Sequence, residues 1–160
     1  MITKSKNLVG VTLLLSLIGC NAARHNMGKR DDLAKEAKVH RYETDWAINV
    51  EKVPNDPRIN RNVFPIGTPK CNLFLCDMLY NVGITPPLTS DGKWPITANM
   101  WTGSVSGWTK ASTQQKGDIV SDGNHCGIAV DSTYTMAAGT SKIYMDQDIK
   151  GGTIQRCDTD

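Results

Sequence analysis

The sequence lacks a strong charge of either sign, a long apolar run and internal repeats. Its 18 Lys and Arg against 16 Asp and Glu leave a formal net charge of only +2. Nucleic acids are bound through a basic surface, so this balance excludes a typical nucleic-acid-binding protein. With 39% hydrophobic and 21% charged residues over 160 positions, the chain is instead typical of one globular domain.

The main apolar stretch, Leu8–Ile18, is too short for a permanent membrane anchor, because a spanning helix needs about 20 apolar residues. It follows two lysines and no acid in Met1–Asn7, a pattern typical of a secretory signal. The next residues, Leu-Ile-Gly-Cys, end at Cys20 and resemble the bacterial lipobox. We therefore expect residues 1–19 to be a lipoprotein signal peptide, with Cys20 lipidated and holding an exported domain at the cell envelope, at the outer membrane in a Gram-negative cell. The alternative is a plain signal peptide cut after Ala22.

Four cysteines follow Cys20, and in an oxidising compartment they would normally form two disulfides. If one of them is a working nucleophile, at most one disulfide remains. The four are Cys71, Cys76, Cys126 and Cys157, and with Cys71 as the nucleophile the sequence leaves the pairing open among the other three.

Hydrophobic periodicity predicts an α+β chain, with helices first and antiparallel strands after them. Residues 20–68 are interpreted as a tether and support segment, with helical character over 24–41. The clearest helix is Cys71–Val82, whose apolar positions share one face, while Asn72, Asp77 and Asn81 fall elsewhere. Residues 84–116 are expected to form a long loop with a short helix near 98–101. Strands are predicted over 118–121, 125–131, 134–138, 142–145 and 153–156.

Two residues in this arrangement form a candidate site. Cys71 lies in the first turn of the predicted helix, where the helix dipole favours a thiolate and unpaired backbone N–H groups can hold an oxyanion. His125 begins a strand directly after a Gly-Asn turn. A strand packed across the helix would bring the imidazole against the thiol, which is the activation that a cysteine nucleophile needs. Asp118 and Cys126 nearby receive structural interpretations: a turn-forming residue, and a core or disulfide cysteine that points away from His125.

Three sequence blocks resemble the NlpC-type papain-like peptidases and the related CHAP amidases. Cys71–Leu75 (Cys-Asn-Leu-Phe-Leu) resembles their Cys-Ser-Gly-Phe-Val helix start, and Lys116–Val120 resembles their Pro-Gly-Asp-Leu-Val turn. His125–Ala129 (His-Cys-Gly-Ile-Ala) resembles their His-Val-Gly-Ile-Tyr strand. The resemblance covers residues 69–138, and Trp94–Ala98 is similar to a Pro-x-Thr-Ala segment of the amidase-like branch.

The resemblance implies a papain-like cysteine hydrolase domain over residues 69–160 that cleaves amide bonds of peptidoglycan stem peptides. Cys71 would attack the carbonyl, and His125 would first take the thiol proton and then supply it to the leaving amine. No metal or other cofactor is implied, because one cysteine and one histidine are too few ligands for zinc. The substrate groove is expected to include Trp94, Thr97 and Trp101.

One position departs from the family pattern. The polar residue that orients the histidine falls at Ala137, which has no hydrogen-bonding side chain. A backbone carbonyl, Thr135, Thr140 or Ser141 are the substitutes that the sequence offers. The main alternative is therefore a weak or inactive papain-like module that binds cell-wall peptide or a protein partner. An amidase delivered to competing cells and a transglutaminase-like acyl transferase, using an acid such as Asp146, are further alternatives.

Overall fold

The computed structural model describes residues 28–59, 63–146, 149 and 151–158, and Cys20 with its signal lies outside this part of the chain. The architecture is a mixed α+β arrangement of helices and one antiparallel sheet, as the sequence predicted. The helices are residues 28–39, α2 (Cys71–Asn81) and α3 (Ala98–Trp101). The strands are β1 (Trp108–Ala111), β2 (Ile119–Ser121), β3 (Cys126–Ala129), β4 (Thr135–Ala138), β5 (Ile143–Asp146) and β6 (Thr153–Cys157).

The sheet has the strand order β1-β6-β2-β3-β4-β5. β2 to β5 form a meander, and β6 returns to pair with both β1 and β2. The prediction of a loop throughout residues 84–116 was wrong at β1, although α3 lies where the short helix was expected. β1 has only four residues and two exposed polar positions in its centre, so its sequence lacks a strand-like alternation. Its pairing with β6, with Trp108 opposite Cys157, defines it as a strand.

α2 carries the candidate nucleophile. Its sequence contains no Gly or Pro, and Gly83, with a φ of +72°, follows its end. The sequence predicted one buried face, but nearly the whole helix is buried, because the sheet covers one side and the preceding segment another. Asp77, expected off the buried face, is 0% exposed and accepts hydrogen bonds from the Trp46 indole N–H at 2.9 Å and the Asn55 backbone N–H at 2.7 Å.

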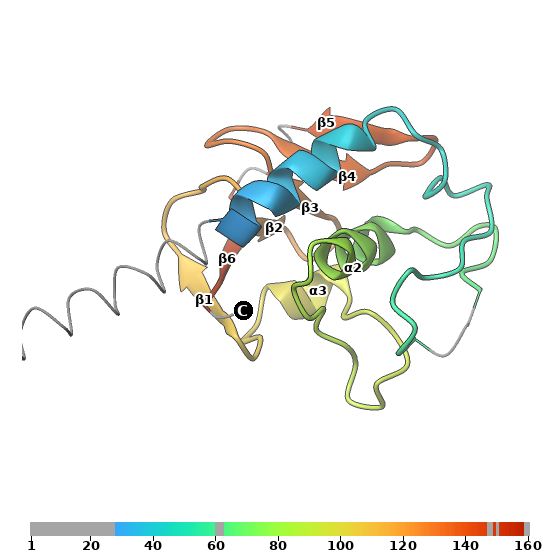
Figure 1. Cartoon of the computed structure of the whole chain (residues 1–160), viewed down its shortest axis with the longest axis horizontal. Helices are drawn as coiled ribbons and strands as arrows, with labels where there is room; N and C mark the ends of the chain where they lie inside the picture. Colours follow the sequence, from blue (N-terminus) through green and yellow to red (C-terminus); the bar gives the residue numbers. More distant parts are fainter. Residues whose placement is uncertain (1–27, 60–62, 147–148, 150, 159–160) are drawn as a thin grey trace, which may run out of the picture.

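The segment before α2 belongs to the same hydrophobic core. Leu33, Ala37, Trp46 and Phe64 join the buried cluster that contains the apolar residues of α2 and of strands β2 to β5. Figure 1 shows the helix over residues 28–39 and α2 next to each other in front of the central strands. The start of α2, where Cys71 lies, is therefore packed against the sheet on one side and against the preceding segment on another.

Asp118 joins three parts of the fold. Its buried carboxylate accepts the Gln115 backbone N–H at 2.8 Å, in keeping with the predicted turn. It also pairs with Arg30 of the first helix at 3.0 Å and with Arg156 of β6 at 2.8 Å. Gly117 lies so close to the Arg30 backbone that a Cβ would overlap the carbonyl, so a side chain there would push the helix away.

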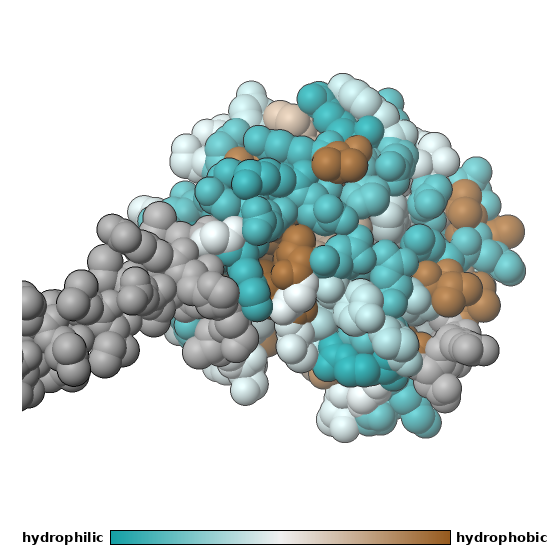
Figure 2. Space-filling view, viewed as in Figure 1, coloured by the Kyte–Doolittle hydropathy of each residue, from teal (hydrophilic) through white to brown (hydrophobic). Residues whose placement is uncertain are grey.

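The surface carries no large apolar area on the face in view. Figure 2 shows a mostly hydrophilic face with apolar side chains in separate groups. The exposed large hydrophobic residues include Val39, Tyr42, Val53 and Ile66. Within the described residues, no helix has the length and apolar character needed to cross a bilayer.

Candidate active site

Cys71 and His125 line the same cavity of about 200 Å³. Cys71 is the first residue of α2, and His125 lies one residue before β3. α2 packs on β3 and β4, and this packing brings the two residues together although they are far apart in the sequence. The Cys71 side chain is buried, whereas His125 is half-buried.

The surroundings of Cys71 favour the thiolate. Its pKa falls to about 5 from an ordinary value of 9.0, chiefly because the Cys126 thiol donates a hydrogen bond to it. Burial opposes the change, and a hydrogen bond and charge interaction with His125 lower the pKa further. The start of α2 contributes in the same direction, because a helix N-terminus favours negative charge. A pKa of about 5 means that the sulfur is ionised at neutral pH.

Cys126 is the main residue of the site that the sequence did not assign to it. The expectation that it lies in the core is confirmed, since it is 0% exposed. Its thiol nevertheless contacts Cys71, and the hydrogen bond to Cys71, together with burial, raises the Cys126 pKa well above its usual value. Both His125 and Cys126 reach Cys71 because β3 begins only at Cys126, so strict strand alternation does not apply to His125. No disulfide joins the four cysteines that the structure describes.

The turn before β3 fixes the backbone of His125. Asp122 Oδ1 accepts the backbone N–H groups of Asn124 at 2.8 Å and of His125 at 2.7 Å. These hydrogen bonds, with the His125 charge, lower the pKa of Asp122. Ser121 Oγ also donates to the His125 carbonyl at 3.0 Å. The Gly-Asn turn in the sequence thus positions the candidate base.

Tyr144 is a second residue of the site that sequence reasoning missed. Its hydroxyl lies 3.5 Å from His125 Nε2, and the two rings are nearly parallel, with centroids 6.4 Å apart. Tyr144 pairs with Ala137 across β4 and β5, so it stands one strand beyond the position where the family pattern has its polar residue. Of the substitutes that the sequence offered, Thr140 lines the cavity as well. The hairpin register was the signal that would have identified Tyr144.

Lys70 holds the wall of the cavity next to Cys71. Its ammonium group is buried and donates to the carbonyls of Ala47 at 3.1 Å and Thr68 at 3.1 Å. Burial lowers the pKa of Lys70. Ile48, next to Ala47, lines the cavity, so Lys70 ties the irregular chain before α2 to the nucleophile.

The expected groove residues lie elsewhere. None of the three lines the Cys71 cavity. Trp101 is 2% exposed and packs edge-on against Trp108 in the core. The Thr97 hydroxyl caps α3 by accepting the Met100 N–H. Trp94 is 38% exposed and contacts Phe64, so it is the one aromatic of this set available at the surface.

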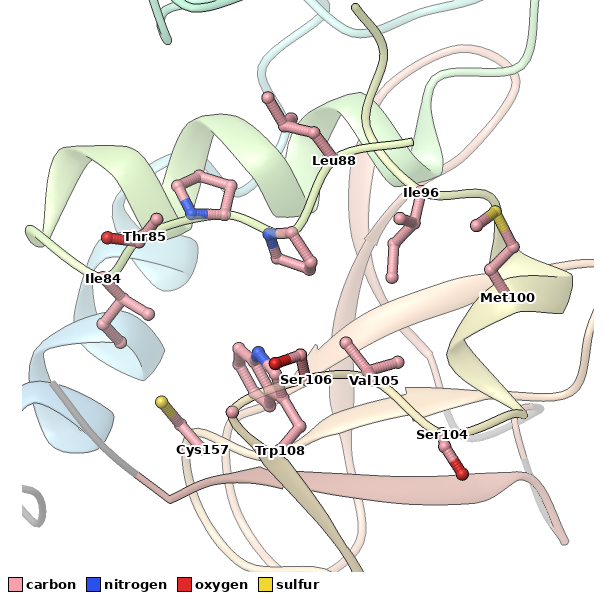
Figure 3. A pocket seen from close by; sticks show the side chains of 13 residues that line it. Ile84, Thr85, Leu88, Ile96, Met100, Ser104, Val105, Ser106, Trp108 and Cys157 are labelled. Atoms are coloured by element: carbon pink, nitrogen blue, oxygen red, sulfur yellow. The ribbon is translucent and has the colours of Figure 1, made fainter. Parts of the chain in front are cut away.

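A larger cavity of about 500 Å³ lies away from the thiolate and shares no lining residue with the Cys71 cavity. Figure 3 shows Ile84 and Leu88, from the chain after α2, on one side of it, and Trp108 and Cys157 next to each other on the opposite side. Its lining is mostly apolar and contains no charged side chain.

Comparisons with known proteins give no relative. No family model, no curated protein and no solved structure matches this chain. Among the residues that the structure describes, no three His, Cys, Asp or Glu side chains group together as metal ligands.

Proposed function

We propose that this chain is an exported, lipid-anchored papain-like cysteine amidase or endopeptidase that hydrolyses an amide bond of peptidoglycan stem peptides. The observation that carries the proposal is the Cys71 thiol, whose pKa is about 5, beside His125 in one cavity. Burial raises the pKa of a structural cysteine, as it does for Cys76. The opposite shift at Cys71 is typical of a nucleophile.

The proposed reaction uses only these two groups and water. The Cys71 thiolate attacks the amide carbonyl carbon and forms an S–C bond, and the π electron pair of the C=O bond moves onto the carbonyl oxygen. The C–N bond then breaks, the amine leaves with the proton held by His125, and a thioester remains on Cys71. Water, deprotonated by His125, hydrolyses the thioester and returns the site to its starting state.

The backbone N–H groups at the start of α2 would stabilise the oxyanion that forms in this reaction. No side chain caps the helix at Lys70, so the first-turn backbone N–H groups are not engaged by a capping side chain. N–H groups at a helix N-terminus stabilise negative charge that develops near them. The carbonyl oxygen of a substrate attacked by Cys71 would lie at this end of the helix.

The architecture is consistent with a papain-like domain. A nucleophile at the start of a helix packs on an antiparallel sheet, and the base precedes the strand on which that helix lies. The three sequence blocks described above occupy the helix start, the turn before β2 and the start of β3. The lipobox-like Leu-Ile-Gly-Cys and the short apolar run support export and a lipid anchor at Cys20.

Mass spectrometry of peptidoglycan fragments tests the proposal. We expect new fragments after incubation with the native chain, none with Cys71→Ala, and unchanged activity with Cys157→Ala as the matched control. The fragment masses would identify the bond. No fragments from a folded, reduced native chain would contradict a hydrolase, and retained binding of wall peptide would then favour the inactive binding module.

A further inference from the structure

A histidine that takes a proton from a cysteine needs a partner at its other ring nitrogen. That partner fixes the tautomer and the ring orientation, and it stabilises the imidazolium that forms. The side chain at the expected position is the methyl group of Ala137, which is fully buried and can make no hydrogen bond. The partner must therefore come from another position.

The sheet register brings Tyr144 to this place. Ala137 of β4 lies directly opposite Tyr144 of β5, and opposite residues of an antiparallel pair point to the same face. The long tyrosine side chain spans the additional strand spacing of about 4.8 Å. Its hydroxyl reaches to 3.5 Å from His125 Nε2.

Gly139 has no side chain and therefore leaves room for the Tyr144 ring. Gly139 directly follows β4, His125 directly precedes β3, and both residues line the Cys71 cavity. A Cβ on Gly139 would overlap Tyr144 Cε1 and lie 2.7 Å from Cδ1. The tyrosine ring therefore lies against the backbone of Gly139, and any side chain at Gly139 would displace it.

We propose that Tyr144 is the positioning residue of the Cys71–His125 pair and that its hydroxyl accepts the Nε2–H of His125 in place of the missing polar group at Ala137. A hydroxyl at Nε2 leaves Nδ1 to exchange its proton with Cys71. The near-parallel rings, 9° apart, restrict rotation of the imidazole in addition. In this role Tyr144 acts through His125. Only the predicted effect of Tyr144 on turnover rests on the proposed function, since its effect on the Cys71 thiolate can be measured without substrate.

Other charged groups also face His125, and their effects on the Cys71–His125 pair must be distinguished from the effect of Tyr144. The Cys71 thiolate attracts the imidazolium directly, and Cys126 acts on that thiolate. The Asp122 carboxylate interacts with the His125 charge as well, although its Oδ1 is already bound to two backbone N–H groups. Asp122→Asn therefore serves as a discriminating variant beside Tyr144→Phe. Tyr80→Phe, at an exposed tyrosine of α2, is the matched control for loss of a phenol oxygen.

The pH profile of Cys71 alkylation by iodoacetamide, followed on the Cys71 peptide by mass spectrometry, is the first test. Tyr144→Phe keeps the ring and removes the oxygen, so the imidazolium loses one acceptor and the midpoint rises by about 0.5 to 1 pH unit. Because the less acidic thiolate is also the stronger nucleophile, this corresponds to alkylation about 1.5-fold to threefold slower at pH 4.5. Gly139→Ala should give a similar shift without removing a polar atom, and Tyr80→Phe should give none.

Turnover of a stem-peptide amide is the second test. Tyr144→Phe should lower kcat by about tenfold to a hundredfold and leave KM unchanged, because orientation of the base matters only during proton transfer. An unchanged alkylation midpoint in both Tyr144→Phe and Gly139→Ala, with circular dichroism showing both folded, would overturn the assignment. So would a shift in Asp122→Asn alone. If the native chain cleaves no peptide, the hydrolase proposal fails, and the alkylation profile still decides the role of Tyr144.

Discussion

The Cys126 thiol is predicted to set the reactivity of Cys71. It is the largest cause of the low Cys71 pKa, which is about 5 against an ordinary value of 9.0. A hydrogen bond to a charged group contributes about 1.5 to 3 kcal/mol, which corresponds to about 1 to 2 pKa units. Cys126→Ala should therefore raise the Cys71 pKa to about 6 or 7, and Cys126→Ser, which keeps a donor, should leave it near its native value.

Selective alkylation makes this shift measurable. At pH 6 a thiol of pKa 5 is about nine-tenths ionised, against about one part in a thousand for a pKa of 9. A thiolate of lower pKa is also a weaker nucleophile, by about 60-fold over four units. The net advantage of native Cys71 over an ordinary thiol at pH 6 is thus about 15-fold.

The assay is iodoacetamide labelling between pH 4 and pH 10, with each cysteine peptide quantified by mass spectrometry. Cys76 and Cys126 supply internal references, because burial helps to raise both pKa values. A native Cys71 midpoint near 9 would refute the thiolate itself. A midpoint that stays near 5 in Cys126→Ala would refute the role of Cys126.

Three further predictions concern stability and targeting. Asp118→Asn should lower the free energy of unfolding by about 3 kcal/mol in urea titrations, because it leaves Arg30 and Arg156 without their buried counter-charge; an unchanged midpoint would contradict this. Burial raises the pKa of Asp77 to about 6 from 3.8, so the stability gained from its protonation is complete below pH 3.8 and is lost as the pH rises through 6. In urea unfolding midpoints measured over a series of pH values, Asp77→Asn should not show this decline, and the same decline with pH in both proteins would contradict the prediction. Cys20→Ala should move the chain from the membrane pellet to the supernatant after cell fractionation, whereas continued sedimentation would exclude a lipid anchor at Cys20.

Local patterns predicted most of the elements. The apolar spacing of Cys71–Val82 and the Gly after it gave α2 within one residue of its observed end. The meander from β2 to β5 followed from short apolar runs separated by turn residues. β1 escaped prediction because its pairing with β6 joins distant parts of the chain, and no local pattern encodes such a partner.

The candidate site was predictable only in part, for the same reason. Helix position and turn chemistry indicated Cys71 and His125, and the structure places both in one cavity. Cys126 required the knowledge that β3 starts after His125, and Tyr144 required the register of the β4–β5 hairpin. Trp101 carried no sign that it lies in the core beside Trp108, since an aromatic residue in a loop suits a groove and a core equally well.

The most direct test of the central claim is to detect the thioester on Cys71. Native chain is mixed with a stem peptide, quenched in acid within the first turnovers and examined by intact-mass and peptide mass spectrometry. We expect an acyl fragment of the peptide attached to Cys71 alone, absent in Cys71→Ala and strongly reduced in His125→Ala. Peptide cleavage without any adduct and with full activity in Cys71→Ala would contradict a cysteine nucleophile at this site.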